Sequence, residues 1–367
     1  MISSIPLLLS LLALASGTSI QQATNNTEEV GISCTIKEYS QVEAVLKYCT
    51  NIILSNVEVP SGKSLNLHLR DGSTLTVRGT ISFDVGHYDI WLVTISGNNI
   101  KVIGEKGSLF HGHGEKYWDG HGGSGGVKKP KLLQITNVNN GHFSNIRLRN
   151  CPMFCTGITK VKDLTIDGWN ADCAEGDKLG RNTDGIGISW AENVHINNVY
   201  IHNQDQCLYV NQGSNMVFTD IHCVNSNGIC ATAGFSKTSY EENTTKNITF
   251  HNCVLEGGLT GVQVIAMADG GAGELTDISF QNVILKGVRQ QGVYVQMDFG
   301  NNGHPNNNIA LKGLKLSHIS GTVSGNSARP YYIVCGKKCS DWKFNDVHVT
   351  GGGVHSSCNY KPAGFNC

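Results

Sequence analysis

Two aspartates of this sequence stand where a pair of carboxylates could do acid–base chemistry. Asp184 and Asp205 lie 21 positions apart, and Asn227 follows 22 positions later. Two carboxylates held close together suit glycosidic bond cleavage, in which one donates a proton to the leaving oxygen and the other activates water. Alternatively, such residues line turns and hydrogen-bond their own backbone, as Asn and Asp often do. The spacing alone leaves both interpretations open.

The nearly constant spacing predicts elements that stack on one another. From Ile52 onward short apolar runs recur, and many of them start at Asn or Asp, as at Asn193, Asn215, Asn247 and Asp277. Such a repeat is typical of a solenoid, in which one coil buries its apolar face only when the next coil stacks on it. We therefore predict an all-β fold, a single-stranded right-handed parallel β-helix. A β-sandwich also has alternating strands, but it needs hairpins with two-residue turns, which are rare here.

One segment near the start of the repeats has a helical pattern. Between Glu38 and Cys49, the apolar residues Val42, Val45 and Leu46 fall on one helical face together with Cys49. Stacked strands need a cover at the end of the solenoid. We predict a short N-terminal capping helix here, and an ordinary surface helix is the alternative.

A glycine-rich segment, 120–131, interrupts the repeats. It lacks the G-x-x-x-x-G-K-[ST] pattern of a phosphate-binding loop, so a long loop is the prediction. His111, His113 and His121 lie near Asp119, but their spacing does not supply a fourth ligand. We therefore predict no metal site, and no cofactor is expected.

The composition and the first residues favour a secreted protein. The formal net charge is −1, which gives no overall electrostatic footprint for nucleic acid or membrane. An apolar run from 7 to 15 followed by small residues predicts a signal peptide at 1–17, since a membrane anchor needs about 18 apolar residues. A polar segment at 18–33 and a single β-helix domain at 34–367 complete the predicted organisation. We expect an extracellular monomer.

Thirteen cysteines behind a signal peptide indicate disulfides. The predicted disulfide cysteines are Cys34 with Cys49, Cys335 with Cys339, Cys358 with Cys367, and also Cys207 and Cys223. Cys230 and Cys253 are interpreted as a structural pair rather than as nucleophiles. The sequence does not fix how Cys151, Cys155, Cys173, Cys230 and Cys253 are paired. The odd count leaves at least one thiol unpaired. N-x-T sequons predict glycosylation at Asn25, Asn243 and Asn247.

Several motifs together resemble the polygalacturonases of glycoside hydrolase family 28. They are Asn182-Thr183-Asp184-Gly185, Asn203-Gln204-Asp205 with Cys207-Leu208, Trp118-Asp119-Gly120 leading into Lys129-Pro130-Lys131, and Val295-Gln296-Met297-Asp298-Phe299. The resemblance extends from about Cys34 to Cys367. It implies a pectin-lyase-like β-helix that is secreted, cross-linked by disulfides, and hydrolyses the galacturonan of pectin in cell walls with inversion.

The resemblance also implies roles for individual residues. Asp205 matches the general acid and Asp184 one of the water-activating bases. Asn182 and Gln296 match positions that bind the substrate.

At five positions the sequence departs from the family pattern. Gln206 stands where a second aspartate follows the acid, and Asn227 where a histidine tunes it. Gln263 and Ile265 stand where an arginine and a lysine grip the galacturonate carboxylate, and Phe299 where a tyrosine is usual. A carboxamide cannot take a proton from water.

These departures predict a degenerate active site. The favoured interpretation is a pseudoenzyme that binds pectin, or that binds proteins which recognise active polygalacturonases. The alternative is an active hydrolase with shifted specificity, for example toward rhamnogalacturonan or methylated pectin.

Overall fold

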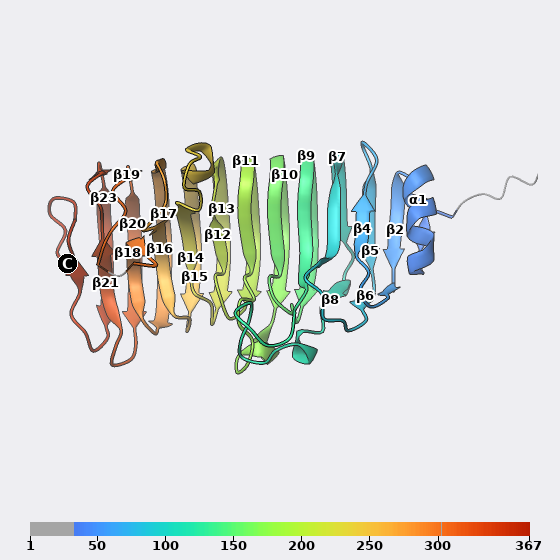
Figure 1. The fold of residues 1–367 in the computed structure, drawn as a ribbon, viewed down its shortest axis with the longest axis horizontal. Coiled ribbons are helices and arrows are strands. Elements are labelled where there is room, and N and C mark those ends of the chain that lie inside the picture. Colours follow the sequence, from blue (N-terminus) through green and yellow to red (C-terminus); the bar gives the residue numbers. More distant parts are fainter. Residues whose placement is uncertain (1–32, 302) are drawn as a thin grey trace, which may run out of the picture. The chain divides into compact units, whose positions relative to one another are not determined.

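The chain folds as predicted, into a right-handed parallel β-helix. The computed structural model describes residues 33–301 and 303–367, in which strands of successive coils pair in parallel along the solenoid axis (Figure 1). The predicted signal peptide, the polar segment up to residue 32 and the sequon at Asn25 lie outside the described residues.

Nearly all regular structure in residues 33–367 is strand. The strands are β1 (Thr35–Ile36), β2 (Asn51–Ser55), β3 (Glu58–Val59), β4 (Leu65–His68), β5 (Thr74–Arg78), β6 (Thr80–Phe83), β7 (Trp91–Gly104), β8 (Leu109–His111), β9 (Lys131–Arg149), β10 (Thr156–Asp172), β11 (Ile186–His202), β12 (Leu208–Val210), β13 (Gly213–Val224), β14 (Ile229–Ala233), β15 (Thr244–Glu256), β16 (Thr260–Met267), β17 (Gly273–Val288), β18 (Gln291–Phe299), β19 (Ile309–Lys312), β20 (Lys315–Val323), β21 (Arg329–Val334), β22 (Cys339–Ser340), β23 (Lys343–Gly351) and β24 (Ser357–Cys358). The helical elements are α1 (Val42–Tyr48) and the 3-10 turns η1 (Tyr39–Gln41), η2 (Gly114–Lys116), η3 (Ala174–Gly176) and η4 (Glu241–Asn243).

The longest strands bend at single asparagines and so pass around more than one side of the coil. In β9 the bends fall at Asn137, Asn140 and Asn145, whose φ angles are 51°, 56° and 54°. Asn adopts this left-handed conformation more readily than other side chains with a Cβ atom. Bend residues of neighbouring coils also bond to one another, since Asn140 Nδ2 donates to Asn99 Oδ1 at 2.7 Å. This geometry explains why Asn or Asp punctuates the apolar runs.

The parallel register stacks equivalent side chains inside the solenoid. Phe218, Phe250 and Phe280 are buried on successive coils, with ring centroids 4.9 Å and 5.0 Å apart. Each coil therefore covers the apolar face of its neighbour, and the register fixes which polar side chains meet on the outside.

The predicted capping helix is present but shorter than expected. The helix α1 begins at Val42, because the 3-10 turn η1 (Tyr39–Gln41) precedes it. Gln41 Oε1 accepts the N–H of Glu38, which caps this turn, at 3.1 Å. Val42 and Val45 are buried, and α1 contacts β1 and β4. No helix within the described part of the chain is long and apolar enough to span a membrane.

The four predicted disulfide pairings occur, and a fifth joins Cys151 to Cys155. The prediction that Cys230 pairs with Cys253 is wrong. Cys230 pairs in register with Gln263 on one side of the coil, whereas Cys253 pairs with Val283 on another. Both are buried thiols, as is Cys173.

The thiols are expected to react only in the unfolded protein. Burial raises the pKa of Cys173 to about 12 and also raises those of Cys230 and Cys253, so little thiolate forms at neutral pH. A thiol-reactive chromophore should therefore detect no thiol in the native protein and three after denaturation without reductant. Detection of one thiol after denaturation would instead indicate that Cys230 and Cys253 are bonded.

One predicted glycosylation position is incompatible with the fold. Asn243 is fully buried, and its Nδ2 donates to the carbonyls of Ser236 at 2.8 Å and Ala272 at 3.2 Å. A glycan on this nitrogen has no space and would remove both bonds, so the prediction for Asn243 is wrong. Asn247 is exposed.

Candidate active site

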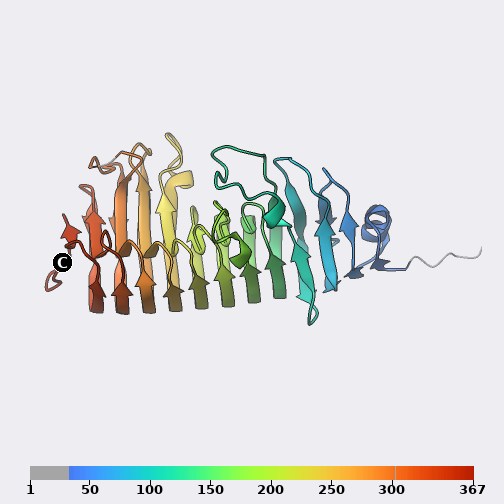
Figure 2. The ribbon, with the colours of Figure 1, turned by 90° about the horizontal axis from the view of Figure 1, so that it is seen from below.

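Three turns on successive coils bring the predicted polar clusters together. The turn 182–185 precedes β11, the turn 203–206 connects β11 to β12, and the turn 225–228 joins β13 to β14. The N–H of Gly185 donates to the carbonyl of Gln206 at 2.8 Å, and the N–H of Asn227 donates to that of Asp205 at 2.7 Å. The equal spacing in the sequence therefore becomes a stack in space. Figure 2 shows the longer loops gathered along one side of the row of strands.

A buried asparagine holds the central turn in shape. Asn203 Nδ2 donates to the carbonyls of Thr183, Asp205 and Gln206 at 2.9, 3.1 and 2.8 Å. Thr183 Oγ1 also donates to Gln204 Oε1 at 2.8 Å. These bonds tie two coils together and fix the backbone that carries both carboxylates.

Asp205 is surrounded by hydrogen-bond donors. One oxygen accepts from Asn182 Nδ2 at 3.0 Å, and the other accepts from Asn227 Nδ2 at 3.2 Å and from the N–H of Gln206 at 2.9 Å. Burial raises the pKa of Asp205, while these three donors oppose the rise. A carboxyl group with a raised pKa is suited to act as a proton donor.

Asp184 is more deeply buried and less well paired. Its exposed fraction is 7 %, and its Oδ1 is buried without a hydrogen-bond partner among the described residues. Burial raises the pKa of Asp184 well above 3.8, and the charge of Asp205 raises it further. The hydroxyl of Tyr209 on β12 hydrogen-bonds to the Asp184 carboxylate. A raised pKa keeps the proton on the Asp184 carboxyl to a higher pH than on an ordinary aspartate, so a smaller fraction of Asp184 is ionised and able to act as a base at a given pH.

Carboxamides close the site on the side of β16. Gln263 is 3 % exposed, and its Nε2 donates to Gln206 Oε1 at 3.1 Å, to Thr260 Oγ1 at 2.6 Å and to the carbonyl of Asn227. Because Asn227 in turn donates to Asp205, three predicted departures form one hydrogen-bonded group that reaches the carboxylates. We call Gln206, Asn227 and Gln263 the carboxamide network.

The comparisons with known proteins agree with this geometry. The profile described as "Glycosyl hydrolases family 28" matches residues 49–367. The chain belongs to glycoside hydrolase family 28.

Among its family 28 relatives is a polygalacturonase of Phaedon cochleariae, which is 37 % identical over 97 % of this chain and 99 % of that protein. A polygalacturonase of Penicillium griseoroseum is 31 % identical over 98 % of both chains. The crystal structure of endopolygalacturonase I from Stereum purpureum, complexed with two galacturonate, superposes with a TM-score of 0.79 at 26 % identity and covers 88 % of this chain and 96 % of that one. Polygalacturonases are therefore similar to this chain over nearly their whole length.

The remaining predicted positions lie farther along the family 28 solenoid. Ile265 is 6 % exposed on β16 and pairs in register with Thr232 and Gln296. Phe299 is 44 % exposed at the end of β18, where its carbonyl accepts from the N–H of Ala268. The structure thus lines up Gln263, Ile265 and Gln296 on adjoining strands, and it leaves Phe299 outside the hydrogen-bonded cluster.

The glycine-rich segment forms the predicted long loop and reaches the site. The N–H of Gly123 donates to Asn182 Oδ1 at 2.9 Å, so the loop contacts the same side chain that donates to Asp205. Lys129, buried at 4 % exposure, holds the loop through Asp119 at 2.9 Å and through the carbonyls of Gly122 and Val127. Burial opposes ionisation of Asp119, but the N–H of His121 and the Lys129 ammonium outweigh it and lower the Asp119 pKa.

Sequence reasoning missed two residues of the site. Tyr209 follows Leu208 in an alternating strand, which indicates an outward side chain but not its bond to Asp184. Lys129 was noted as part of a motif, but not as the buried cation that anchors the loop. Both roles depend on contacts between coils, which a single sequence does not specify.

Two groups of side chains among the described residues bring possible metal ligands together. One is Cys151, Cys155 and Cys173, in which Cys151 and Cys155 are already joined in a disulfide, and the other contains two histidines. Ligand atoms of His111, His113 and Glu115 lie within 4.8 Å of one another, and His113 Nδ1 is 3.2 Å from Glu115 Oε1. His121 is not part of this group. The backbone N–H of His113 donates to His111 Nδ1 at 3.1 Å, so a metal at that nitrogen would have to displace this bond. The absence of a metal remains a prediction.

Proposed function

We propose that this protein is a secreted member of family 28 that binds pectic polysaccharide and is impaired in its hydrolysis. The carboxamide network is the observation that supports the proposal. Gln206 stands beside the acid Asp205 where the family resemblance expects an aspartate, and an amide nitrogen or oxygen cannot accept the proton of an attacking water. Asp184 alone would have to serve as the base, and its surroundings favour the protonated form.

The loss of two cations supports the same proposal. Gln263 and Ile265 replace an arginine and a lysine of the family pattern, and both are nearly buried on β16. Hydrogen bonds from charged groups contribute about 1.5–3 kcal/mol each. Binding of an anionic sugar at this position is therefore expected to be weaker than in a polygalacturonase that keeps both cations.

A second candidate function is hydrolysis, with inversion, of a less anionic pectin. Ile265 and Gln263 present a neutral surface that suits a methyl-esterified or rhamnose-containing backbone better than a carboxylate. Asp205, with its raised pKa, would donate the proton, and Asp184 would act as the base. In this case the replacement of an arginine and a lysine by Gln263 and Ile265 changes which substrate is bound and does not abolish the activity.

We also propose that the chain is processed and glycosylated during secretion. Residues 1–17 are removed as a signal peptide, and the β-helix domain 34–367 acts as a monomer with glycans at Asn25 and Asn247. Proteins that recognise active polygalacturonases are the other class of partner that the retained fold would suit.

The test is a combined binding and turnover assay with the purified protein. The substrates are polygalacturonic acid, methyl-esterified pectin, rhamnogalacturonan and a neutral glycan. We expect binding to a pectic glycan without release of reducing sugar. Release from polygalacturonic acid that is abolished by Asp205→Asn would overturn the proposal, and release confined to a less anionic pectin would establish the second candidate.

A further inference from the structure

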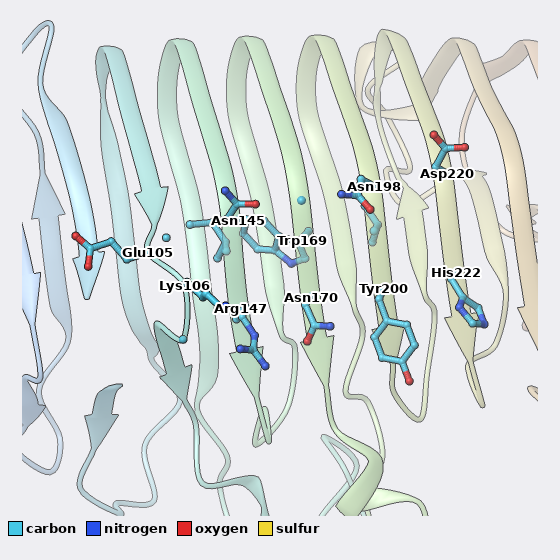
Figure 3. A pocket seen from close by; sticks show the side chains of 15 residues that line it. Glu105, Lys106, Asn145, Arg147, Trp169, Asn170, Asn198, Tyr200, Asp220 and His222 are labelled. Carbon is cyan, nitrogen blue, oxygen red and sulfur yellow. The ribbon is translucent and has the colours of Figure 1, made fainter. Parts of the chain in front are cut away.

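A concavity of the described chain lies away from the paired carboxylates, on an outer face of β9, β10, β11 and β13. Its volume is about 710 Å³, and none of its lining residues belongs to the three turns of the candidate active site. A second concavity of about 610 Å³ continues it past Asp220 and His222. We call the first concavity the lateral groove (Figure 3).

The strand register builds one side of this lateral groove as a column. Four residues on successive coils are register partners, each of the next: Arg147, Asn170, Tyr200 and His222. Figure 3 shows their side chains projecting from neighbouring strands along the groove. Neighbouring strands are about 4.8 Å apart, so the column presents groups at regular intervals to a ligand that extends along the axis.

Two cationic side chains of the lateral groove have no partner among the described residues. The side chains of Lys106 and Arg147 make no hydrogen bond or ion pair with any residue in the described ranges 33–301 and 303–367. The neighbouring carboxylate of Glu105 is already neutralised, because Arg78 donates to both of its oxygens at 2.8 and 2.7 Å. The groove therefore offers free positive charge to a carboxylate.

Acidic side chains near the far end of the lateral groove also have partners. Glu256 lies 3.7 Å from Lys286 Nζ and 3.4 Å from His222 Nε2, and Asp220 accepts from Asn252 Nδ2 at 3.2 Å. The free positive charge of the groove is thus at the end formed by Lys106 and Arg147. Asp220 keeps its negative charge at the far end, because its donor Asn252 is neutral.

The middle of the lateral groove suits a sugar ring. Tyr200 is half-buried and is held edge-on by His222, with ring centroids 5.4 Å apart. Carboxamides of Asn145, Asn170 and Asn198 also line the groove, and Asn170 pairs in register with Tyr200. An aromatic surface beside amide donors and acceptors is the usual composition of a site for a ligand with both an apolar face and hydroxyl groups.

We propose that the lateral groove binds an acidic oligosaccharide, with a uronate carboxylate at Lys106 and Arg147 and a pyranose ring against Tyr200. This site is separate from the candidate active site, so it does not rest on the proposed function. The protein would then hold an acidic polysaccharide on a face other than the one that carries Asp184 and Asp205.

The test is an isothermal calorimetric titration of the full chain with a galacturonate hexamer. Arg147→Glu is expected to weaken binding at the lateral groove about tenfold or more, because it replaces a charge-assisted bond with a repulsion. Tyr200→Ala is expected to weaken it as well. The matched control is Lys101→Glu, which makes the same kind of charge change at an exposed lysine of β7 outside the groove. All three variants should keep the wild-type melting temperature within a few degrees.

Hydrogen exchange locates the bound hexamer independently of the variants. Peptides that contain Arg147, Asn170 and Tyr200 are expected to exchange more slowly with the ligand present. Equal weakening by Arg147→Glu and Lys101→Glu, or no slowing of exchange in these peptides, would overturn the proposal. So would equally tight binding of a neutral hexasaccharide or of a glutamate hexapeptide at the groove.

Discussion

A variant that carries Gln206→Asp, Asn227→His, Gln263→Arg and Ile265→Lys is expected to release reducing sugar from polygalacturonic acid at least about a hundredfold faster than the unchanged protein. A positioned acid or base contributes about 10²–10⁴-fold to a rate, and Gln206→Asp supplies the missing base. The arginine and the lysine restore charge-assisted bonds to the substrate carboxylate. The Asp205 turn is already held by Asn203 and needs no rebuilding.

The four substitutions are expected to act only in combination. Gln263 Nε2 donates to Gln206 Oε1, to Thr260 and to the carbonyl of Asn227, so changing one member leaves the others with unmatched donors or acceptors. Groups that act as a unit in catalysis are also strongly non-additive. Each single variant should therefore remain near the activity of the unchanged protein.

The control for this experiment is the same four substitutions together with Asp205→Asn. That protein should fold equally well and lose the regained activity, which assigns the turnover to this site. If the fourfold variant folds with an unchanged melting temperature and releases no sugar, more than the carboxamide network separates this chain from active polygalacturonases. Tyr209, which hydrogen-bonds to Asp184, is then the next residue to replace.

The parts of the fold that depend on repetition could be predicted from the sequence. Asn193, Asn215 and Asn247 recur because each coil must bend at the same place, and this recurrence predicts the solenoid and the stacking of Asp184 on Asp205. The capping helix was predicted because Val42 and Val45 share a face. The 3-10 turn before this helix could not be predicted in the same way. It depends on the Gln41 side chain, whose Oε1 accepts the N–H groups of Lys37 and Glu38.

The parts that depend on which side of a coil a residue occupies could not be predicted. Cys230 and Cys253 are on different sides and remain thiols, although their separation in sequence resembles one coil. Asn243 has a sequon but is buried under Ser236 and Ala272. The lateral groove has no sequence signature, since Arg147 and Tyr200 meet only through the register of β9, β10 and β11.

Asp184→Asn is expected to stabilise the folded protein at neutral pH. The Asp184 carboxylate is nearly buried, and its Oδ1 has no hydrogen-bond partner among the described residues. A buried polar group without a partner costs about 1–3 kcal/mol, and a charged one costs more. A neutral carboxamide of the same shape removes the charge, so a gain of about 1–3 kcal/mol is expected, seen as a rise of a few degrees in melting temperature at pH 7.

The pH dependence of this gain follows from the direction of the pKa shift. Burial and the charge of Asp205 raise the pKa of Asp184 in the folded protein above its ordinary value of 3.8. A group of this kind stabilises the fold below its unfolded pKa, and that contribution is lost as the pH rises through the folded pKa. The difference in melting temperature between Asp184→Asn and the unchanged protein should therefore be small near pH 4 and should grow toward pH 7.

The matched control is Asp167→Asn, at an exposed aspartate that accepts from Asn197 Nδ2 at 3.2 Å. Its melting temperature should follow that of the unchanged protein at both pH values. A lower melting temperature for Asp184→Asn at pH 7 would mean that the ionised carboxylate is favoured by the bond from Tyr209. Asp184 would then be available as a base, and the second candidate function would gain support over an impaired site.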